Sequence, residues 1–113
     1  MWSLRKQTNK YKAKRQEYNG IGYHSKREAS KAWELDQLVK TGEVIEWKRQ
    51  VKVPLEVNGH HIANYYVDFL ITWKGGDKEF VEIKGFETEV WRLKWKLFEA
   101  LYEGKGYKLT VEK

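Results

Sequence analysis

Two glycine-containing turns divide the middle of this chain into three segments of β-type residues. Asn58-Gly59 is a strong signal for a β-hairpin, and Gly75-Gly76 marks a second turn. The flanking segments 43–57, 62–73 and 78–84 are rich in β-branched and aromatic residues. Turns this short connect neighbouring antiparallel strands, so the pattern predicts three strands paired in sequence order.

A helix is predicted on each side of these strands. Ser25 is followed three residues later by Glu28, a capping-box pattern that predicts a helix through about Lys40. Residues 89–103 form a second helical segment, rich in Trp, Leu and Phe, and the alternating residues 107–111 form a last strand. The predicted order in this α/β chain is helix, three strands, helix, strand.

Length and composition indicate one small domain. The chain has 113 residues and no cysteine, which excludes disulfides and thiolate metal sites. No apolar run approaches the roughly 20 residues of a membrane-spanning helix, and the N-terminus lacks the apolar stretch of a signal peptide. We therefore expect a soluble, cytoplasmic protein without a membrane partner.

The chain is strongly basic, with a formal net charge of +6. Such a charge makes it a candidate nucleic-acid binder, although a charged surface can equally serve solubility. Residues 1–18 are predicted to be a basic arm ahead of a domain at 19–113, and the alternative is a solvated tail without function. The residues expected to contact DNA are Arg5, Lys6, Lys10, Lys12, Lys14, Arg15 and Lys26.

Three charged residues on the predicted strands indicate a chemical site. Asp68 interrupts an apolar run on the second strand, and Glu82 and Lys84 lie two residues apart on the third. Because side chains alternate across a strand, Glu82 and Lys84 point to the same face. Two carboxylates supply the oxygen ligands that a hard cation such as Mg²⁺ prefers. A lysine beside them can orient a water or stabilise charge on a phosphate.

This site can form only with a certain length of the turn between the second and third strands. With a strict two-residue loop at Gly75-Gly76, Asp68 would oppose Ile83 and face away from Glu82. The site therefore needs a connection of odd length or a β-bulge. The alternative is that the charges are ordinary solvent-facing residues. Asp68 argues against this, because a carboxylate in an apolar run is costly to bury unless it is paired or binds a metal.

Four residues on the predicted helices allow two interpretations each. Glu28 could be a third metal ligand, but it is also the glutamate of the capping box. Lys94 lies in the middle of the apolar side of the second helix, from which it extends either to the surface or toward the catalytic face. Trp91 and Trp95 flank that side and could serve a dimer face or pack in the core.

The layout resembles the PD-(D/E)XK nuclease superfamily over residues 20–111, which implies a restriction-endonuclease-like core with a mixed central sheet. Residues 22–29 (GYHSKREA) and 84–86 (KGF), with the Lys-rich aromatic helix that follows, look like a small phage family. That family is similar to archaeal-type Holliday-junction resolvases. The sequence departs from the pattern at Val67, which stands where the motif's proline would be.

The resemblance implies a site and an activity. Glu28, Asp68 and Glu82 would hold Mg²⁺, with Mn²⁺ as a substitute, and Lys84 and Lys94 would assist catalysis. The implied reaction is DNA hydrolysis, and a resolvase that cuts branched DNA symmetrically should be a homodimer. A nicking or restriction-like nuclease of the same fold, or a non-catalytic DNA-binding module, are the alternatives.

Overall fold

The structure is a computed structural model that describes residues 16–18, 21–23 and 25–113. The chain divides into two compact units, Met1–Gln37 and Leu38–Lys113. Six of the residues expected to contact DNA, those between positions 5 and 15, lie outside the described residues. Among the helices that the structure describes, none has the length and apolar character to cross a membrane.

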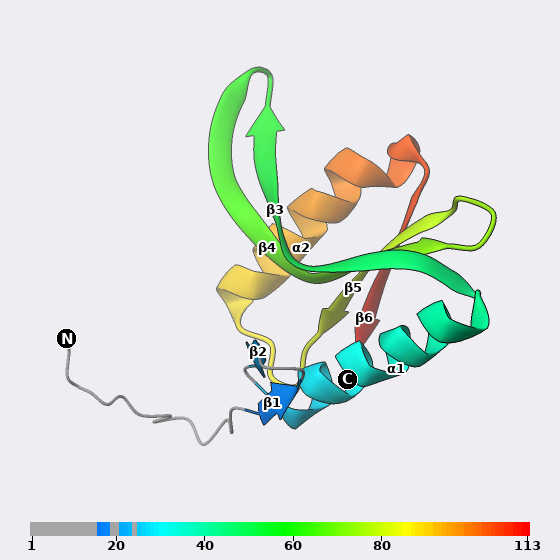
Figure 1. The fold of residues 1–113 in the computed structure, drawn as a ribbon. Helices are drawn as coiled ribbons and strands as arrows, with labels where there is room; N and C mark the ends of the chain where they lie inside the picture. The colour runs from blue at the N-terminus through cyan, green and yellow to red at the C-terminus, as the bar shows by residue number, and fades with distance from the viewer. Residues whose placement is uncertain (1–15, 19–20, 24) are drawn as a thin grey trace. The chain divides into compact units, whose positions relative to one another are not determined.

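The first unit contains a short hairpin and most of a helix (Figure 1). Strands β1 (Gln16–Tyr18) and β2 (Ile21–Tyr23) pair antiparallel, and this hairpin was not predicted from the sequence. Helix α1 (Lys26–Thr41) begins where the capping box places it, because the backbone N–H of Glu28 donates to Oγ of Ser25 at 3.2 Å. The predicted helix is therefore confirmed to within one residue at its end.

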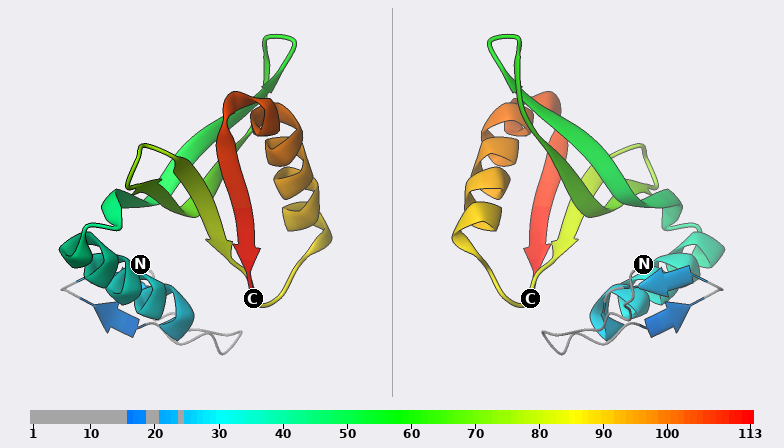
Figure 2. Two further views of the ribbon diagram at one scale, coloured as in Figure 1. Left: turned by 90° about the vertical axis from the view of Figure 1, so that its right-hand side faces the viewer. Right: turned by 90° about the vertical axis from the view of Figure 1, so that its left-hand side faces the viewer.

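The second unit is a four-stranded mixed sheet in the order β3-β4-β5-β6, with one long helix (Figures 1 and 2). The first three strands are antiparallel in sequence order, and β5 and β6 are parallel, because α2 carries the chain back between them. Helix α2 runs alongside β6 in both views of Figure 2. The elements are β3 (Val44–Val57), β4 (His60–Trp73), β5 (Lys78–Ile83), α2 (Glu89–Tyr102), the 3₁₀ turn η1 (Glu103–Lys105) and β6 (Tyr107–Glu112).

Strands β3 and β4 form a long hairpin around the predicted two-residue turn. Asn58 and Gly59 both have positive φ, 51° and 81°, as a tight hairpin turn of this type requires. Only residues 69–72 of β4 pair with β5, so the far end of the hairpin projects beyond the sheet, as Figures 1 and 2 show. The predicted order of strands and helices is confirmed in this unit.

The core between sheet and helix α2 is largely aromatic. Trp91 and Trp95 are only 8% and 7% exposed and pack beside Phe98. Their interpretation as core residues is confirmed, and they are not available as a dimer face. Val90, one residue before Trp91, is 65% exposed. The indole rings, and not the aliphatic side chain beside them in the sequence, therefore define the buried face at the start of this helix.

Candidate functional site

Pairing between the chain segments of β4 and β5 extends one step beyond Thr72 and Lys78, to Trp73 and Asp77, so three residues remain in the loop, 74–76. The backbone N–H of Trp73 donates to the carbonyl of Asp77 at 2.8 Å, and that of Gly76 donates to the carbonyl of Trp73 at 2.9 Å. Gly75 and Gly76 have φ values of 96° and 100°, which glycine adopts without the steric cost of a side chain. The loop therefore has the odd length that the predicted site requires.

This loop length sets the register of the two acids. The β4–β5 ladder pairs Phe69 with Val81, and one further step in the same register places Asp68 across from Glu82. Directly opposed residues of an antiparallel pair share a face of the sheet. The structure therefore brings Asp68 and Glu82 together, as the sequence analysis proposed.

The two carboxylates also replace backbone acceptors at this point of the sheet. The backbone N–H of Asp68 donates to Oε1 of Glu82 at 3.3 Å, and the N–H of Ile83 donates to Oδ2 of Asp68 at 2.9 Å. Asp68 is 8% exposed and Glu82 is 6% exposed. Each acid thus accepts a hydrogen bond from a backbone amide across the two strands, which fixes the position of both carboxylates.

Gln50 on β3 holds the other oxygen of Asp68. Its Nε2 donates to Oδ1 of Asp68 at 3.0 Å. The β3–β4 register places Gln50 opposite Asp68, and its φ of 50° is a left-handed conformation that is unusual for a residue with a side chain. Such conformations cluster at functional sites, where surrounding structure maintains them.

Tyr65 holds Glu82 from the side of helix α2. The Tyr65 hydroxyl is hydrogen-bonded to the Glu82 carboxylate and accepts a 2.8 Å hydrogen bond from Nε1 of Trp91. Burial, and then the charge of Glu82, raise the pKa of Tyr65. The phenol therefore stays protonated and acts as a donor to Glu82.

The pKa of Glu82 is raised from 4.5 to about 7, first by burial and then by the charge of Asp68. The hydrogen bond from the Asp68 amide, the charge of Lys84 and the hydrogen bond with Tyr65 act in the opposite direction. In the absence of a cation, the carboxyl of Glu82 therefore keeps its proton to a higher pH than an exposed glutamate does. A bound cation would favour the ionised form of this acid.

Lys84 follows directly after β5. Its backbone N–H donates to the carbonyl of Glu112 at 2.8 Å, which continues the pairing with β6. Strand alternation directs its side chain to the face of Glu82, and Nζ lies 5.3 Å from the ring centroid of Trp91. Lys84 is therefore beside the acid pair. Lys94 lies half-buried on α2, one turn after Trp91, and its catalytic role stays a prediction.

The two remaining predicted residues lie in the first unit. Glu28 is 8% exposed in the first turn of α1, and Lys26 is exposed at the start of the same helix. The acid pair belongs to the second unit. The role of Glu28 as a third ligand and that of Lys26 in DNA contact stay predictions.

The donor set of the acid pair fits Mg²⁺ or Mn²⁺. Across residues 16–18, 21–23 and 25–113, no group of three or more His, Asp and Glu side chains is placed to hold a metal ion. Mg²⁺, however, is commonly held by one or two carboxylates and completes its coordination with water and phosphate. Asp68 and Glu82 offer only oxygen, and burial beside each other raises the pKa of Glu82, a cost that a cation would offset.

Sequence reasoning did not single out Gln50 or Tyr65. Both are ordinary residues within β-type segments, and their contacts with Asp68 and Glu82 depend on strand register. The apolar run around Asp68 was the available signal, since a buried carboxylate needs hydrogen-bond donors close by.

Among known families, the model described as "Protein of unknown function (DUF1064)" matches residues 8–111 of the chain. Neither a curated protein nor a solved structure matches the chain.

Proposed function

This chain belongs to the DUF1064 family, and we propose that it is a metal-dependent DNA endonuclease with a PD-(D/E)XK-like core. The observation that supports the proposal most directly is the opposed pair Asp68 and Glu82, two buried carboxylates with Lys84 beside them. The net charge of +6 suits a polyanionic substrate.

In this proposal, Asp68 and Glu82 hold Mg²⁺, and Mn²⁺ substitutes for it. When bound, Mg²⁺ polarises a phosphate oxygen and lowers the pKa of a water molecule. Gln50 and Tyr65 keep the two carboxylates oriented, as outer-shell groups do at metal sites. Lys84 orients the attacking water or stabilises the negative charge that develops on the phosphate.

Further residues complete the proposed enzyme. Glu28 serves as a third acidic ligand, and Lys94 supplies an additional positive charge from α2. Lys26 and the basic residues of the N-terminal arm neutralise phosphates along the DNA. Each of these roles adds to that of the acid pair and can be tested by a substitution of its own.

We further propose that the preferred substrate is a four-way DNA junction. The resemblance of residues 22–29 and 84–86 to a phage family similar to archaeal-type Holliday-junction resolvases supports this choice. Resolution of a junction needs two symmetric cuts, so the active form would be a homodimer with twofold symmetry. A nicking or restriction-like activity on plain duplex is the competing proposal.

The test is cleavage of labelled four-way junction, flap and linear duplex, in Mg²⁺ and in chelator. We expect paired symmetric cuts in the junction alone, and none with chelator. Asp68→Asn should reduce the rate by more than the roughly 100-fold typical for outer-shell groups. Lys84→Met should reduce the rate by about 100-fold or more while DNA binding is retained.

Glu103→Gln is a suitable control, because Glu103 is exposed in η1 at the far end of α2. It should cleave at the wild-type rate. Cleavage of all three substrates would keep the nuclease and exclude junction selectivity. Tight DNA binding without cleavage in any metal would instead favour a non-catalytic DNA-binding module.

A further inference from the structure

An open groove of about 380 Å³ lies along helix α2, and Val111 of strand β6 also lines it. Val111 in its lining is the β6 register partner of Glu82, and neighbouring strands lie about 4.8 Å apart. Trp91, also in the lining, has Lys84 over its ring at 5.3 Å. The groove is therefore next to Glu82 and Lys84, which we propose take part in cleaving the DNA phosphodiester bond.

The groove combines an apolar lining with three cations and one acid. Leu93 is 69% exposed, which leaves apolar surface of the lining open to solvent. The charged residues of the lining are Arg92, Lys96, Lys113 and Glu87, a local net charge of +2 from three positive charges and one negative charge. Apolar surface with excess positive charge is complementary to a nucleic-acid strand, which carries bases and sugars on a chain of phosphates.

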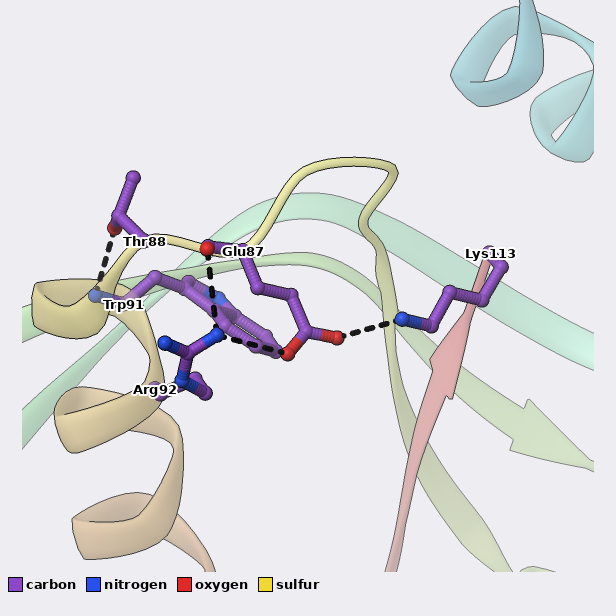
Figure 3. Close-up of polar contacts among 5 residues, drawn as sticks. All are labelled: Glu87, Thr88, Trp91, Arg92 and Lys113. Atoms are coloured by element: carbon purple, nitrogen blue, oxygen red, sulfur yellow. Dashed lines mark hydrogen bonds and ion pairs between the residues drawn. The ribbon is translucent and has the colours of Figure 1, made fainter.

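Glu87 is bound to two of the three cations, as Figure 3 shows. Its Oε2 lies 2.9 Å from Nζ of Lys113, and its Oε1 lies 3.7 Å from Nη1 of Arg92. Arg92 Nη1 also donates to the backbone carbonyl of Glu87 at 3.4 Å. The hydrogen bond from Lys113 lowers the pKa of Glu87, so this carboxylate is ionised at neutral pH.

These ion pairs are exposed to solvent, so another anion can replace the Glu87 carboxylate in them. The side chains of Arg92 and Lys113 are 53% and 72% exposed, and Glu87 is 24% exposed. Ion pairs open to solvent contribute little free energy, so exchange of one anion for another is inexpensive. A phosphate offers more acceptor oxygens than a carboxylate and pairs readily with Arg and Lys.

We propose that this groove binds the DNA strand next to the cleaved phosphate, and that Glu87 occupies the place of a DNA phosphate in the free protein. On binding, a phosphate replaces the Glu87 carboxylate between Arg92 and Lys113, and Leu93 contacts a sugar or base. This inference rests on the proposed nuclease function, because it takes the acid pair as the point of cleavage.

The test is equilibrium binding of a labelled DNA junction to the full chain in chelator, where no cleavage occurs, over a range of salt concentrations. Arg92→Gln and Lys113→Gln should each weaken binding. Each should also reduce the slope of log affinity against log salt by about 0.7 to 0.9, the value for one lost phosphate contact. Both side chains are exposed, so circular dichroism should show an unchanged fold.

The substitution Glu87→Gln should have the opposite effect on DNA affinity. Removal of the competing carboxylate should strengthen binding by about 2- to 5-fold, the range expected for one exposed ion pair. Glu103→Gln changes the charge equally at the other end of α2, about 20 Å along a 14-residue helix. Glu103→Gln should leave the affinity within about 1.5-fold of wild type, since long-range charge effects are screened.

Two results would overturn the inference: wild-type affinity and salt slope in both Arg92→Gln and Lys113→Gln, or equal effects of Glu87→Gln and Glu103→Gln. The nuclease proposal fails separately, if wild type binds the junction but never cuts it in Mg²⁺ or Mn²⁺. If wild type cuts DNA and the groove variants bind normally, the groove assignment alone is wrong.

Discussion

At the scale of single residues, the surroundings of Glu82 act on its carboxyl in two directions. Burial and the charge of Asp68 favour the protonated form, while the Asp68 amide, Lys84 and Tyr65 favour the ionised form. The first group is stronger, because the pKa is raised to about 7. A cation bound as proposed would therefore favour the ionised form of this acid.

This shift predicts a pH-dependent stability for the metal-free protein. Because the folded pKa of Glu82 lies above its ordinary value of 4.5, folding favours the protonated form. That contribution is complete below pH 4.5 and is lost as the pH rises through 7, a change on the order of 3 kcal/mol. We expect the free energy of unfolding of wild type to fall relative to Glu82→Gln between pH 5 and pH 8, measured by urea titration in chelator.

Glu103→Gln should follow wild type across this range, since Glu103 is exposed. If the stability of Glu82→Gln changed with pH in parallel with wild type, the carboxyl of Glu82 would not be the titrating group.

At the scale of elements, turn chemistry allowed much of the second unit to be predicted. Asn58-Gly59 and Gly75-Gly76 located the strands, and the amphipathic pattern located α2. Gln50 was missed for a physical reason. The tight turn pairs Val57 with His60, and if this register continued, Gln50 would lie opposite Val67. An irregularity between Leu55 and Glu56 shifts the ladder by one residue and places Gln50 opposite Asp68 instead. Bulges of this kind have no clear sequence signal.

The β1–β2 hairpin was also missed, and the sequence left open whether Trp91 and Trp95 pack in the core. The hairpin lies at the end of a basic segment whose composition suggested a solvated arm. On α2, Trp91 and Trp95 are buried while Val90 is exposed, because two stacked indoles 5.8 Å apart fill the space over the sheet. Residue type alone does not indicate which apolar side chains a helix buries.

The N-terminus of α2 yields a prediction about stability. Oγ1 of Thr88 accepts a 3.1 Å hydrogen bond from the backbone N–H of Trp91, which satisfies one free amide of the first turn. Thr88→Ala should lower the free energy of unfolding by about 1 kcal/mol. Thr88→Ser keeps the hydroxyl and should therefore retain most of this contribution. Chemical denaturation of the three proteins measures both. Equal losses in Ala and Ser would show that the hydroxyl does not contribute.

At the scale of the whole molecule, cation binding and folding are linked. A ligand that binds only the folded chain stabilises it by mass action, about 2.7 kcal/mol at 100 times its dissociation constant. In the proposed site, binding must also displace the proton of Glu82, whose pKa is about 7. Cation binding should therefore stabilise the protein more strongly above pH 7 than below it.

The corresponding measurement is thermal unfolding with and without Mn²⁺ at pH 8 and at pH 5. We expect a clear rise in Tm at pH 8 and a much smaller rise at pH 5. Asp68→Asn should abolish the rise at pH 8 because one ligand is lost. An equal rise in Asp68→Asn would mean that the cation binds elsewhere on the protein.

The hydrogen bonds that backbone amides donate to Asp68 and Glu82 between β4 and β5 have an evolutionary consequence. Asp68 and Glu82 each accept a hydrogen bond from a backbone amide across these strands, so selection for folding alone would tend to preserve them even if the proposed catalysis were lost. The Lys84 side chain accepts no such amide, because an ammonium group has no acceptor. Drift in an inactive descendant of this chain should therefore appear at position 84 before it appears at 68 or 82.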